Sequence, residues 1–447
     1  MLRTSVRAMS SAVAVVLVIG IQSSALFAAQ ASERDGATPV RLSNAVRTDQ
    51  EVKAASAAAA AHPANEDAWV RFGDALMQKG RETADAAYCG RAESAFQKAL
   101  KLNPHSIGAL AGLAWVNGVR HEFEASIEWA KKALAEDPTN VAALGLIGDA
   151  AVEMGDYEKA FELYQKMLDL RPDLSSYGRS AHLLQVTGDL RKAGWLMHKA
   201  IEAGSPYAEN TAWCRSQLAL MMFAQGAFVP AEQVLTEGLK DAPDDYRLLA
   251  AMGKVKAARK EYDAAIDYYR RATAIAPQQD FVAALGDVYA AAGKPDDAAR
   301  QYALVESIAR LNKANGIRGD MLTAKFYADH DRNLAEALKM AEEEYQTRKN
   351  VYMADTLAWC YFKNGRLDEA KRYIAAALSE STPEASFLYH KGMIYAQAGD
   401  RRKAQIALYQ AMSLNAAFDP LQMPIAERAM AELGSKAPAA PAMTAQR

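Results

Sequence analysis

The sequence is poor in cysteine and carries no excess of either charge. Its three cysteines, Cys89, Cys214 and Cys360, lie far apart in the chain, unlike the dense cysteine framework of a small disulfide-stabilised domain. The 52 lysine and arginine residues are balanced by 54 aspartate and glutamate residues. This balance argues against a nucleic-acid-binding protein, because such proteins present a basic face to phosphates. We therefore expect buried or idle thiols and no nucleic-acid partner.

Enzyme signatures are also missing. The sequence contains no H-E-x-x-H zinc motif, no G-x-S-x-G turn, no phosphate-binding loop and no C-x-x-C pair. His330 lies between Asp329 and Asp331, but three adjacent residues cannot all face one metal ion, so a solvated helix end is the favoured interpretation. We expect no catalytic residue, no metal site and no cofactor. An enzyme stays a third hypothesis, which a metal or cofactor bound to the purified protein would revive.

Long apolar runs are confined to the start of the chain, at positions 1–31. Arg3 and Arg7 precede an apolar run from Ala12 to Ile21, and small residues at 29–31 offer a cleavage site. This pattern predicts a secretory signal peptide at residues 1–31. The mature protein is then expected in the periplasm or outside the cell, as a soluble chain without stable membrane insertion.

The alternative is an uncleaved membrane anchor. The polar residues Gln22, Ser23 and Ser24 end the apolar run, well short of the ~20 residues that a membrane-spanning helix needs. A cleaved signal peptide, with a mature chain that begins at Ser32, is therefore the preferred interpretation.

Evenly spaced prolines give the rest of the chain a period of about 34 residues. Pro104, Pro138 and Pro172 recur at this interval, and so do Pro243 and Pro277. Proline ends a helix because it lacks the N–H donor and clashes with the preceding turn. Its recurrence therefore marks the end of a repeating unit.

The first repeat carries an insertion. The interval from Pro63 to Pro104 is longer than the period by seven positions. We place the additional positions at 81–91, and predict a loop or extended turn there, between two helices.

Small and aromatic residues recur at fixed places between the prolines. Gly148 is followed by Tyr164, and Gly253 by Tyr269. Each unit is predicted to form two helices joined by a tight turn, with apolar residues at three- and four-residue spacing. A glycine in one helix lets the other helix approach closely, while the aromatic ring fills the space beside the crossing.

These residues resemble the tetratricopeptide repeat family over roughly residues 66–417, and the chain is similar to uncharacterised exported bacterial members of that family. The resemblance implies an all-α fold: a right-handed α-solenoid of about ten helical hairpins with N- and C-terminal capping helices. Family members serve mostly as scaffolds and peptide-binding modules. The expected organisation is a signal peptide at 1–31, a linker and capping helix at 32–65, a solenoid at 66–417 with an irregular joint near 305–320, a capping helix at 418–434, and a disordered Ala- and Pro-rich tail at 435–447.

In this family the first helix of each unit lines the concave surface, so the register of the repeats predicts which side chains form the groove. The predicted partner-binding residues are Trp115, Asp149, His182, Trp213, Lys254, Asp287, Tyr352, Asp355, Trp359 and Tyr389. The aromatic members of this set are the expected anchors for a partner. The alternative is that these rings pack between adjacent helices as ordinary core.

The favoured function is a non-catalytic scaffold that binds a partner polypeptide in this groove, within the cell envelope. The alternative is an assembly subunit of an envelope export or biogenesis machine, such as polysaccharide secretion, whose contacts spread over the convex face and the caps. The identity of the partner, the pathway and the oligomeric state stay open.

Overall fold

The computed structural model describes residues 44–204, 207–314 and 320–434. Every secondary-structure element in these ranges is an α-helix, which confirms the all-α prediction. The predicted signal peptide, the predicted C-terminal tail and part of the predicted joint near 305–320 lie outside the described residues.

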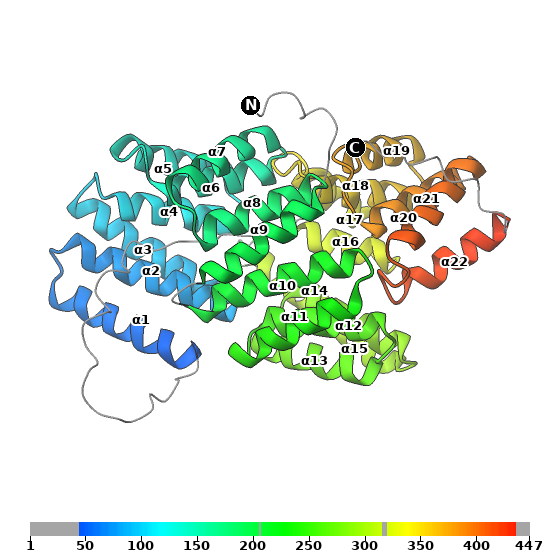
Figure 1. Cartoon of the computed structure of the whole chain (residues 1–447), viewed down its shortest axis with the longest axis horizontal. Helices are drawn as coiled ribbons and strands as arrows, with labels where there is room; N and C mark the ends of the chain where they lie inside the picture. The colour runs from blue at the N-terminus through cyan, green and yellow to red at the C-terminus, as the bar shows by residue number, and fades with distance from the viewer. Residues whose placement is uncertain (1–43, 205–206, 315–319, 435–447) are drawn as a thin grey trace. The chain divides into compact units, whose positions relative to one another are not determined.

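The described ranges contain 22 helices, which follow one another as hairpins with one helix before and one after them (Figure 1). Their bounds are α1 Asn44–Ala61, α2 Glu66–Thr83, α3 Ala87–Leu102, α4 Ile107–Val119, α5 Phe123–Glu136, α6 Val141–Glu153, α7 Tyr157–Leu170, α8 Leu174–Val186, α9 Leu190–Ala203, α10 Ala208–Ala224, α11 Phe228–Asp241, α12 Tyr246–Ala258, α13 Tyr262–Ile275, α14 Gln279–Ala291, α15 Pro295–Ala314, α16 Asp320–Asp329, α17 Leu334–Glu344, α18 Val351–Lys363, α19 Leu367–Ala377, α20 Ala385–Gln397, α21 Arg401–Leu414 and α22 Gln422–Glu432. This array of hairpins between two end helices confirms the predicted fold class.

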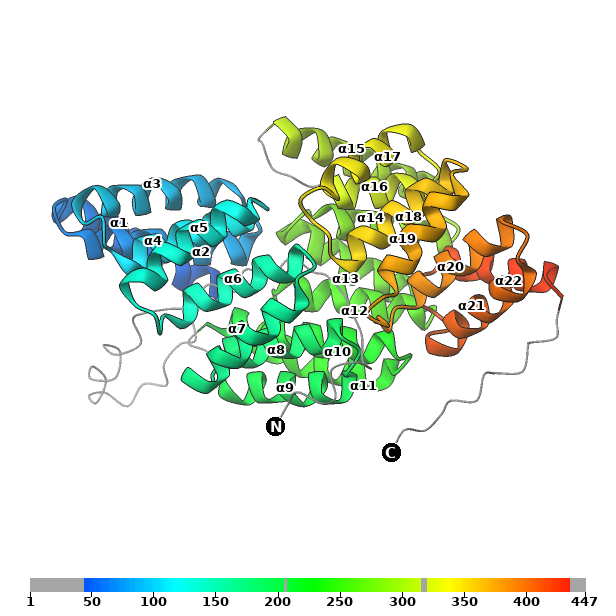
Figure 2. The ribbon, with the colours of Figure 1, turned by 90° about the horizontal axis from the view of Figure 1, so that it is seen from above.

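Contacts between the helices divide the described residues into two compact units. The N-terminal unit comprises residues 44–180, 202–204 and 207–211, and the C-terminal unit comprises residues 181–201, 212–314 and 320–434. Within each unit the first helix of a hairpin contacts the first helix of the next, as α2, α4 and α6 do in the N-terminal unit. In the C-terminal unit α12, α14, α16, α18 and α20 form the same kind of row (Figure 2). We call each row a first-helix face.

Side chains at the helix ends explain where many helices begin and stop. Asn65 and Asn140 precede α2 and α6, and their side-chain oxygens accept hydrogen bonds from the backbone N–H of Asp67 and Ala143. These caps satisfy donors that a helix N-terminus leaves free. At the other end, Asn103 closes α3 in an extended conformation (φ −138°, ψ 102°), as expected for a residue that precedes proline.

The predicted contact between glycine and an aromatic ring is confirmed. A Cβ atom added at Gly73 would lie 2.4 Å from Phe96 Cε1, and one added at Gly148 would lie 2.3 Å from Tyr164 Cε1. Only a residue without a side chain fits at such separations. Glycine thus sets the distance between the two helices of these hairpins, and the ring fills the crossing.

The insertion in the first hairpin is helical, so the predicted loop at 81–91 is wrong. Helix α2 has 18 residues and α3 has 16, against 13 in α4 and 14 in α5. The differences of five and two residues account for the seven added ones. Arg81, in the extension of α2, forms an ion pair with the buried carboxylate of Glu209 at 2.9 Å. This distant partner holds the added turn in place.

Helix α1 covers the start of the N-terminal unit. Ala59 is buried, and the Lys79 ammonium on α2 lies 2.8 Å from the Asp49 carboxylate on α1. At the other end of the chain, Arg401 and Gln405 on α21 donate hydrogen bonds to the Leu433 carbonyl just after α22. Both end helices are therefore fastened by side-chain contacts, while the predicted domain boundaries stay predictions.

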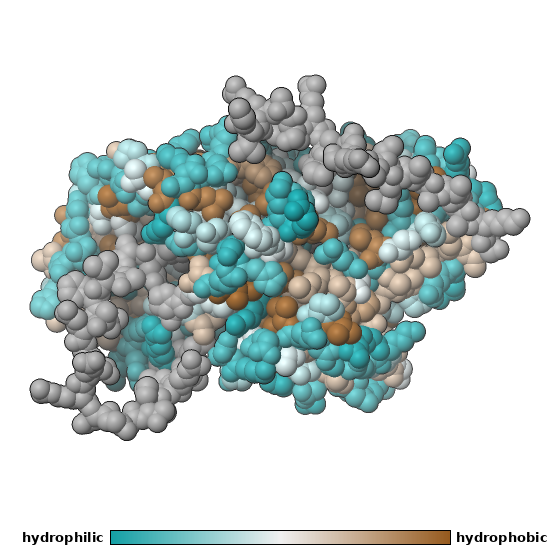
Figure 3. Space-filling view, in the orientation of Figure 1, coloured by the Kyte–Doolittle hydropathy of each residue, from teal (hydrophilic) through white to brown (hydrophobic). Residues whose placement is uncertain are grey.

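The outer surface is mixed in character. On the face shown in Figure 3, hydrophilic residues separate the apolar ones. Large exposed apolar side chains, such as Trp195 and Leu311, come from different helices. None of the described helices has the length and apolarity needed to cross a membrane.

Candidate functional site

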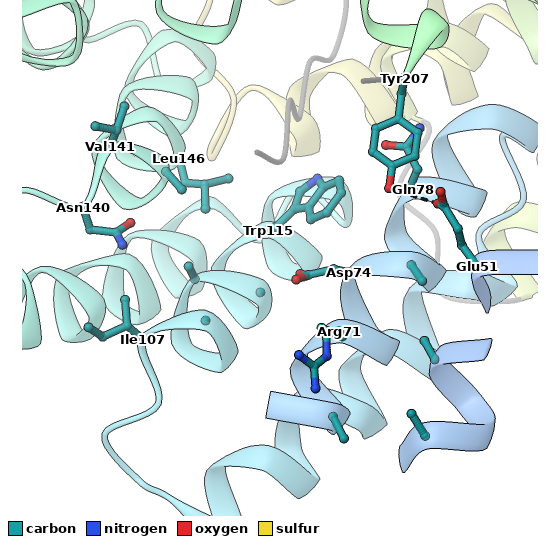
Figure 4. A pocket seen from close by; sticks show the side chains of 18 of the residues that line it. Glu51, Arg71, Asp74, Gln78, Ile107, Trp115, Asn140, Val141, Leu146 and Tyr207 are labelled. Atoms are coloured by element: carbon teal, nitrogen blue, oxygen red, sulfur yellow. Dashed lines mark hydrogen bonds between the residues drawn. The ribbon is translucent and has the colours of Figure 1, made fainter. Parts of the chain in front are cut away.

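A cavity of about 750 Å³ lies within the N-terminal unit (Figure 4). Helices α1, α2, α4 and α6 line it, together with Arg171 after α7 and Tyr207 before α10. Its volume is in the range of pockets that hold ligands in proteins, about 300–1,000 Å³. The first-helix face of this unit is therefore hollowed enough to take part of another molecule.

Small residues make nearly half of the wall. On α1, α2 and α4 they are spaced by three, four or seven positions, apart from two adjacent pairs, so they share one helix face. They are Ala54, Ala55 and Ala58 on α1, Ala68 and Ala75 on α2, Gly108, Ala111 and Gly112 on α4, and Ala142 on α6. Because these side chains are short, the space in front of them stays open.

Paired polar groups close one end of the cavity. The Tyr207 hydroxyl donates to Glu51 at 3.0 Å, and Arg47 also donates to Glu51 at 3.0 Å. The Gln78 amide donates to Glu209 at 3.3 Å. These groups are already satisfied within the unit, so they shape the cavity rather than wait for a ligand.

Trp115 lies in the middle of the cavity lining, with Leu146 on one side and Tyr207 on the other (Figure 4). Its side chain is 7% exposed, and its indole N–H has no hydrogen-bond partner among the described residues. A buried donor without an acceptor costs about 1–3 kcal/mol. A ligand that supplies an acceptor would recover this energy.

Asp74 lies beside Trp115 and is also without a partner in the described part of the chain (Figure 4). Burial raises the pKa of its carboxyl group to about 7. No neighbouring charge contributes to this shift. The cavity therefore holds an unpaired donor and an unpaired carboxyl group from adjacent repeats.

Asp149, predicted as a groove residue, occupies the same place in its repeat but is fully paired. It accepts hydrogen bonds from the Tyr164 hydroxyl at 2.8 Å and from the Arg179 guanidinium at 2.8 and 2.9 Å. Arg179 is 3% exposed. Burial opposes a charge on Arg179, but the charge and the hydrogen bonds of Asp149, with the neighbouring Tyr164 and Asp173, together outweigh it and raise the Arg179 pKa.

Asp287, also predicted as a groove residue, is paired in the same way within the C-terminal unit. It accepts from the Tyr302 hydroxyl at 2.8 Å, and His330 Nε2 lies 2.8 Å from the same oxygen. Burial opposes a positive charge on His330, but the hydrogen bond and charge of Asp287 outweigh it and raise the His330 pKa. This pair favours a protonated His330.

The residues around His330 do not converge on one point. Asp329 pairs with Lys325, and Asp331 lies 2.7 Å from Lys363. Over the described ranges, no group of three or more His, Cys, Asp or Glu side chains could hold a metal ion. All three cysteines are buried.

Most of the other predicted groove residues are packed inside the C-terminal unit. Asp355, Trp359 and Tyr389 are each 2% exposed. The Trp359 ring stacks on His390 with centroids 4.1 Å apart and lies 5.7 Å from Tyr389. Their role in partner binding stays a prediction, but they offer almost no surface in this conformation.

The remaining predicted residues differ in exposure. His182 and Trp213 are buried. Tyr352 is half-buried, with its ring 5.2 Å from that of Phe387. Lys254 is exposed, and its ammonium lies 5.0 Å from the Phe223 ring centroid. Of the ten predicted residues, Trp115 is the one that lines the described cavity.

Sequence reasoning missed Asp74, Glu51 and Tyr207. Asp74 could have been found, because it follows Gly73 as Asp149 follows Gly148. Glu51 and Tyr207 lie outside the regular repeat positions and are brought together by contacts between segments 156 residues apart. No local pattern predicts such a contact.

Two tetratricopeptide repeat models match parts of this chain, one over residues 120–182 and the other over residues 89–141, 223–280 and 356–417. Proteins built from such repeats generally serve as protein-interaction scaffolds. The matches include α4 and α6, which line the cavity.

Curated relatives are similar over part of their length. BBSome complex member BBS4 of Bos taurus is 24% identical over 230 residues, which is 50% of this chain and 42% of that protein. The type IV pilus assembly protein PilF of Pseudomonas aeruginosa is 28% identical over 173 residues, 37% of this chain and 63% of that protein. The chain thus spans less than two thirds of either relative. Among solved structures, yeast Tom70 aligns with a TM-score of 0.39 and 14% identity, over 86% of this chain and 96% of that one.

Proposed function

We propose that this chain, whose segments match tetratricopeptide repeat models, is a non-catalytic scaffold that binds a partner polypeptide in the cavity of the N-terminal unit. One observation carries the proposal: the nearly buried Trp115 indole has an N–H without a partner in the described part of the chain, and it lines a cavity of about 750 Å³. Aromatic anchors in pockets are typical of the residues that dominate protein–protein binding.

The dimensions suit a short polypeptide segment. A helix about 10 Å across rises about 1.5 Å per residue, so about two turns would fill this volume. An extended segment, at about 3.3 Å per residue, would place fewer residues in it. In both cases the small wall residues leave room for large side chains of the partner, and the Trp115 N–H would donate to one of its carbonyl groups.

Filling the cavity tests this proposal. Ala111→Phe on α4 adds a ring inside the cavity, whereas Ala135→Phe on α5 adds the same ring at an exposed position. The full-length variants are expressed in the native host, crosslinked and captured, and the bound proteins are quantified by mass spectrometry. We expect Ala111→Phe to lose at least tenfold of the captured partner, and Ala135→Phe to retain it.

Equal capture by the two variants would contradict binding in the cavity. Circular dichroism of both variants controls for folding. Loss of helicity in Ala111→Phe would move the test to Trp115→Phe, which removes the N–H donor while it keeps a ring at the site.

Export to the cell envelope is a further part of the proposal. The charged, apolar and small-residue segments of residues 1–31 support it. Sequencing the N-terminus of the protein from its native source tests it. We expect the mature chain to begin at Ser32, and an intact N-terminus in the cytoplasmic fraction would contradict export.

A structural assembly subunit of an envelope machine is the second candidate function. The similarity to a type IV pilus assembly protein over 173 residues favours it. In that case deletion of the gene would remove a surface polymer or appendage. The Ala111→Phe variant would then restore the polymer or appendage as well as the unaltered chain does, because the contacts would lie on other surfaces.

A further inference from the structure

Three aspartates occupy one position of the repeat, directly after the glycine that packs against a ring. They are Asp74 after Gly73, Asp149 after Gly148 and Asp287 after Gly286. At the last two positions the ring belongs to a tyrosine, whose hydroxyl donates to the aspartate at 2.8 Å. At the first position the ring belongs to Phe96, which has no hydroxyl.

The paired aspartates also hold a cation. Arg179 binds Asp149 through two nitrogens, and His330 binds Asp287 at 2.8 Å. Asp74 has neither a hydroxyl nor a cation next to it in the described part of the chain, and it faces the cavity instead. At two of the three positions the aspartate thus has both a hydroxyl and a cation as partners. At the third, which faces the cavity, it has neither among the described residues.

We infer that Asp74 binds a positively charged side chain of the partner, an arginine or a lysine, where Arg179 binds Asp149. This inference rests on the proposed binding of a polypeptide in the cavity, and it names the chemistry that the cavity selects. The partner's cation takes the place of the missing cation. A carbonyl group of the partner, close to its arginine or lysine, accepts a hydrogen bond from the Trp115 N–H.

An asparagine or glutamine side chain of the partner, which carries a neutral amide, fits Asp74 less well than an arginine or lysine does. A neutral amide would satisfy the Trp115 donor and share a hydrogen with Asp74, but it would leave the carboxylate charge unpaired at a half-buried position. An uncompensated buried charge is unfavourable, whereas charge-assisted hydrogen bonds are the stronger ones. At both filled positions of the repeat, the aspartate binds a cation.

The other ionisable groups that line the cavity are either paired or exposed, so Asp74 is the group among them that can bind the partner's cation. They are Glu51 on α1, Arg71 on α2, Arg171 after α7 and Tyr207. Glu51 is occupied by Arg47 and Tyr207, and Arg171 is paired with Asp173 at 2.7 Å. Arg71 is exposed, so solvent screens its charge.

This arrangement makes binding dependent on pH. Burial raises the pKa of Asp74 to about 7, so the carboxyl group is mostly protonated at pH 6 and mostly ionised at pH 8. A cationic side chain binds the ionised form, so its affinity is expected to rise about tenfold between these pH values. A neutral ligand would lack this rise.

A peptide library displayed on phage tests the inference with the full-length protein. The unaltered chain selects peptides, and each selected peptide is measured again with Asp74→Asn and with Asp67→Asn, which removes one exposed charge from the same helix. We expect the selected peptides to share one arginine or lysine. Their affinity is expected to fall at least tenfold with Asp74→Asn, and to change less than twofold with Asp67→Asn.

A second variant tests the same site without removing the carboxyl group. Phe96→Tyr offers Asp74 the hydroxyl that Tyr164 gives to Asp149. This hydrogen bond favours the ionised carboxylate, so the pH at which binding rises is expected to move below 7. An unchanged pH profile would contradict the assignment of Asp74 as the group that binds the cation.

The outcomes separate the inference from the proposed function. Peptides that lose binding with Ala111→Phe but carry no shared basic residue would overturn the inference and leave the proposed function standing. Basic peptides that bind Asp74→Asn as tightly as the unaltered chain would also overturn the inference. Peptides that bind Ala111→Phe unchanged would overturn both.

Discussion

One position of the repeat holds an aspartate that is paired in the C-terminal unit, but that is left unpaired at one of its two occurrences in the N-terminal unit. In the C-terminal unit Asp287 is held by Tyr302 and His330, whereas in the N-terminal unit Asp74 faces a cavity with no partner among the described residues. The helices around the two aspartates follow the same pattern, with a glycine packed against a ring at each. A single missing hydroxyl and a missing cation therefore distinguish a closed structural position from an open one.

The paired aspartates contribute to the stability of the fold, whereas the unpaired one is available to bind a partner. A paired, buried carboxylate fixes two helices and has no capacity left for a partner. An unpaired carboxyl group weakens the unit slightly and keeps that capacity. Four sets of substitutions test this difference. Three are ordered from the largest expected effect to the smallest, and the effect of the fourth depends on pH.

Removal of a cation from a filled position has the largest expected effect. Arg179→Met leaves the Asp149 carboxylate without its buried partner, and such losses cost about 3–5 kcal/mol. Urea unfolding followed by circular dichroism measures the change. Arg71→Met, at the exposed edge of the cavity, is the control and is expected to change stability by less than about 0.5 kcal/mol. Similar effects of the two variants would remove the distinction between filled and open positions.

Substitution of the glycines that pack against a ring, which occur in both units, is expected to have the next largest effect on stability. Gly148→Ala and Gly286→Ala each place a Cβ atom within 2.5 Å of a tyrosine ring, and overpacking of this kind costs about 1–3 kcal/mol. Gly90→Ala on α3 is the control, because no atom lies within 4 Å of its added Cβ. It is expected to stabilise the helix by up to about 1 kcal/mol. Destabilisation by all three variants would point to backbone effects instead of packing.

Replacement of the tyrosine that donates to Asp149 is expected to have a smaller effect on stability. Tyr164→Phe removes one hydrogen bond to Asp149 and is expected to lower the free energy of unfolding by about 1 kcal/mol. It converts this position into a partial copy of the one at Asp74. Thermal unfolding measures the change, and an unaltered midpoint would show that the hydroxyl does not contribute.

The last test concerns the unpaired carboxyl group itself, whose effect on stability depends on pH. The Asp74 pKa is raised to about 7 in the fold, from its ordinary value of 3.8. The folded chain therefore binds more protons between about pH 4 and pH 7, and its stability falls as pH rises through this window. Asp74→Asn removes the dependence, so the variant is expected to be more stable than the unaltered chain at pH 8 and equally stable at pH 4.

Urea midpoints at these two pH values measure this effect. A midpoint difference of the same size at both would mean that the carboxyl group titrates at its ordinary pKa. A lower midpoint for Asp74→Asn at pH 8 would mean that a charged partner stabilises Asp74 in the free protein.

Most of the fold followed from short-range patterns in the sequence. Recurring prolines located the ends of the units, and Gly148 with Tyr164 located a helix crossing. The added turn of α2 was mispredicted, because it depends on Arg81 meeting Glu209, 128 residues away. The division into two units likewise arises from contacts between distant segments, which no repeat pattern encodes.

The candidate site was predicted less completely, for a geometric reason. The register of a repeat tells which helix a residue lies on, but not how deeply its neighbours cover it. Trp115 and Trp359 occupy the same slot in their repeats, yet the first lines the cavity and the second stacks on His390 in the core. The open position at Asp74 becomes visible only when the partners of Asp149 and Asp287 are known.

A crystal structure of the full-length protein with a library-selected peptide tests the central claim most directly. We predict a basic side chain of the peptide against the Asp74 carboxylate, and a peptide carbonyl within hydrogen-bond distance of Trp115 Nε1. A peptide bound along α3, α5 or α7, with Asp74 and Trp115 still unpartnered, would contradict it.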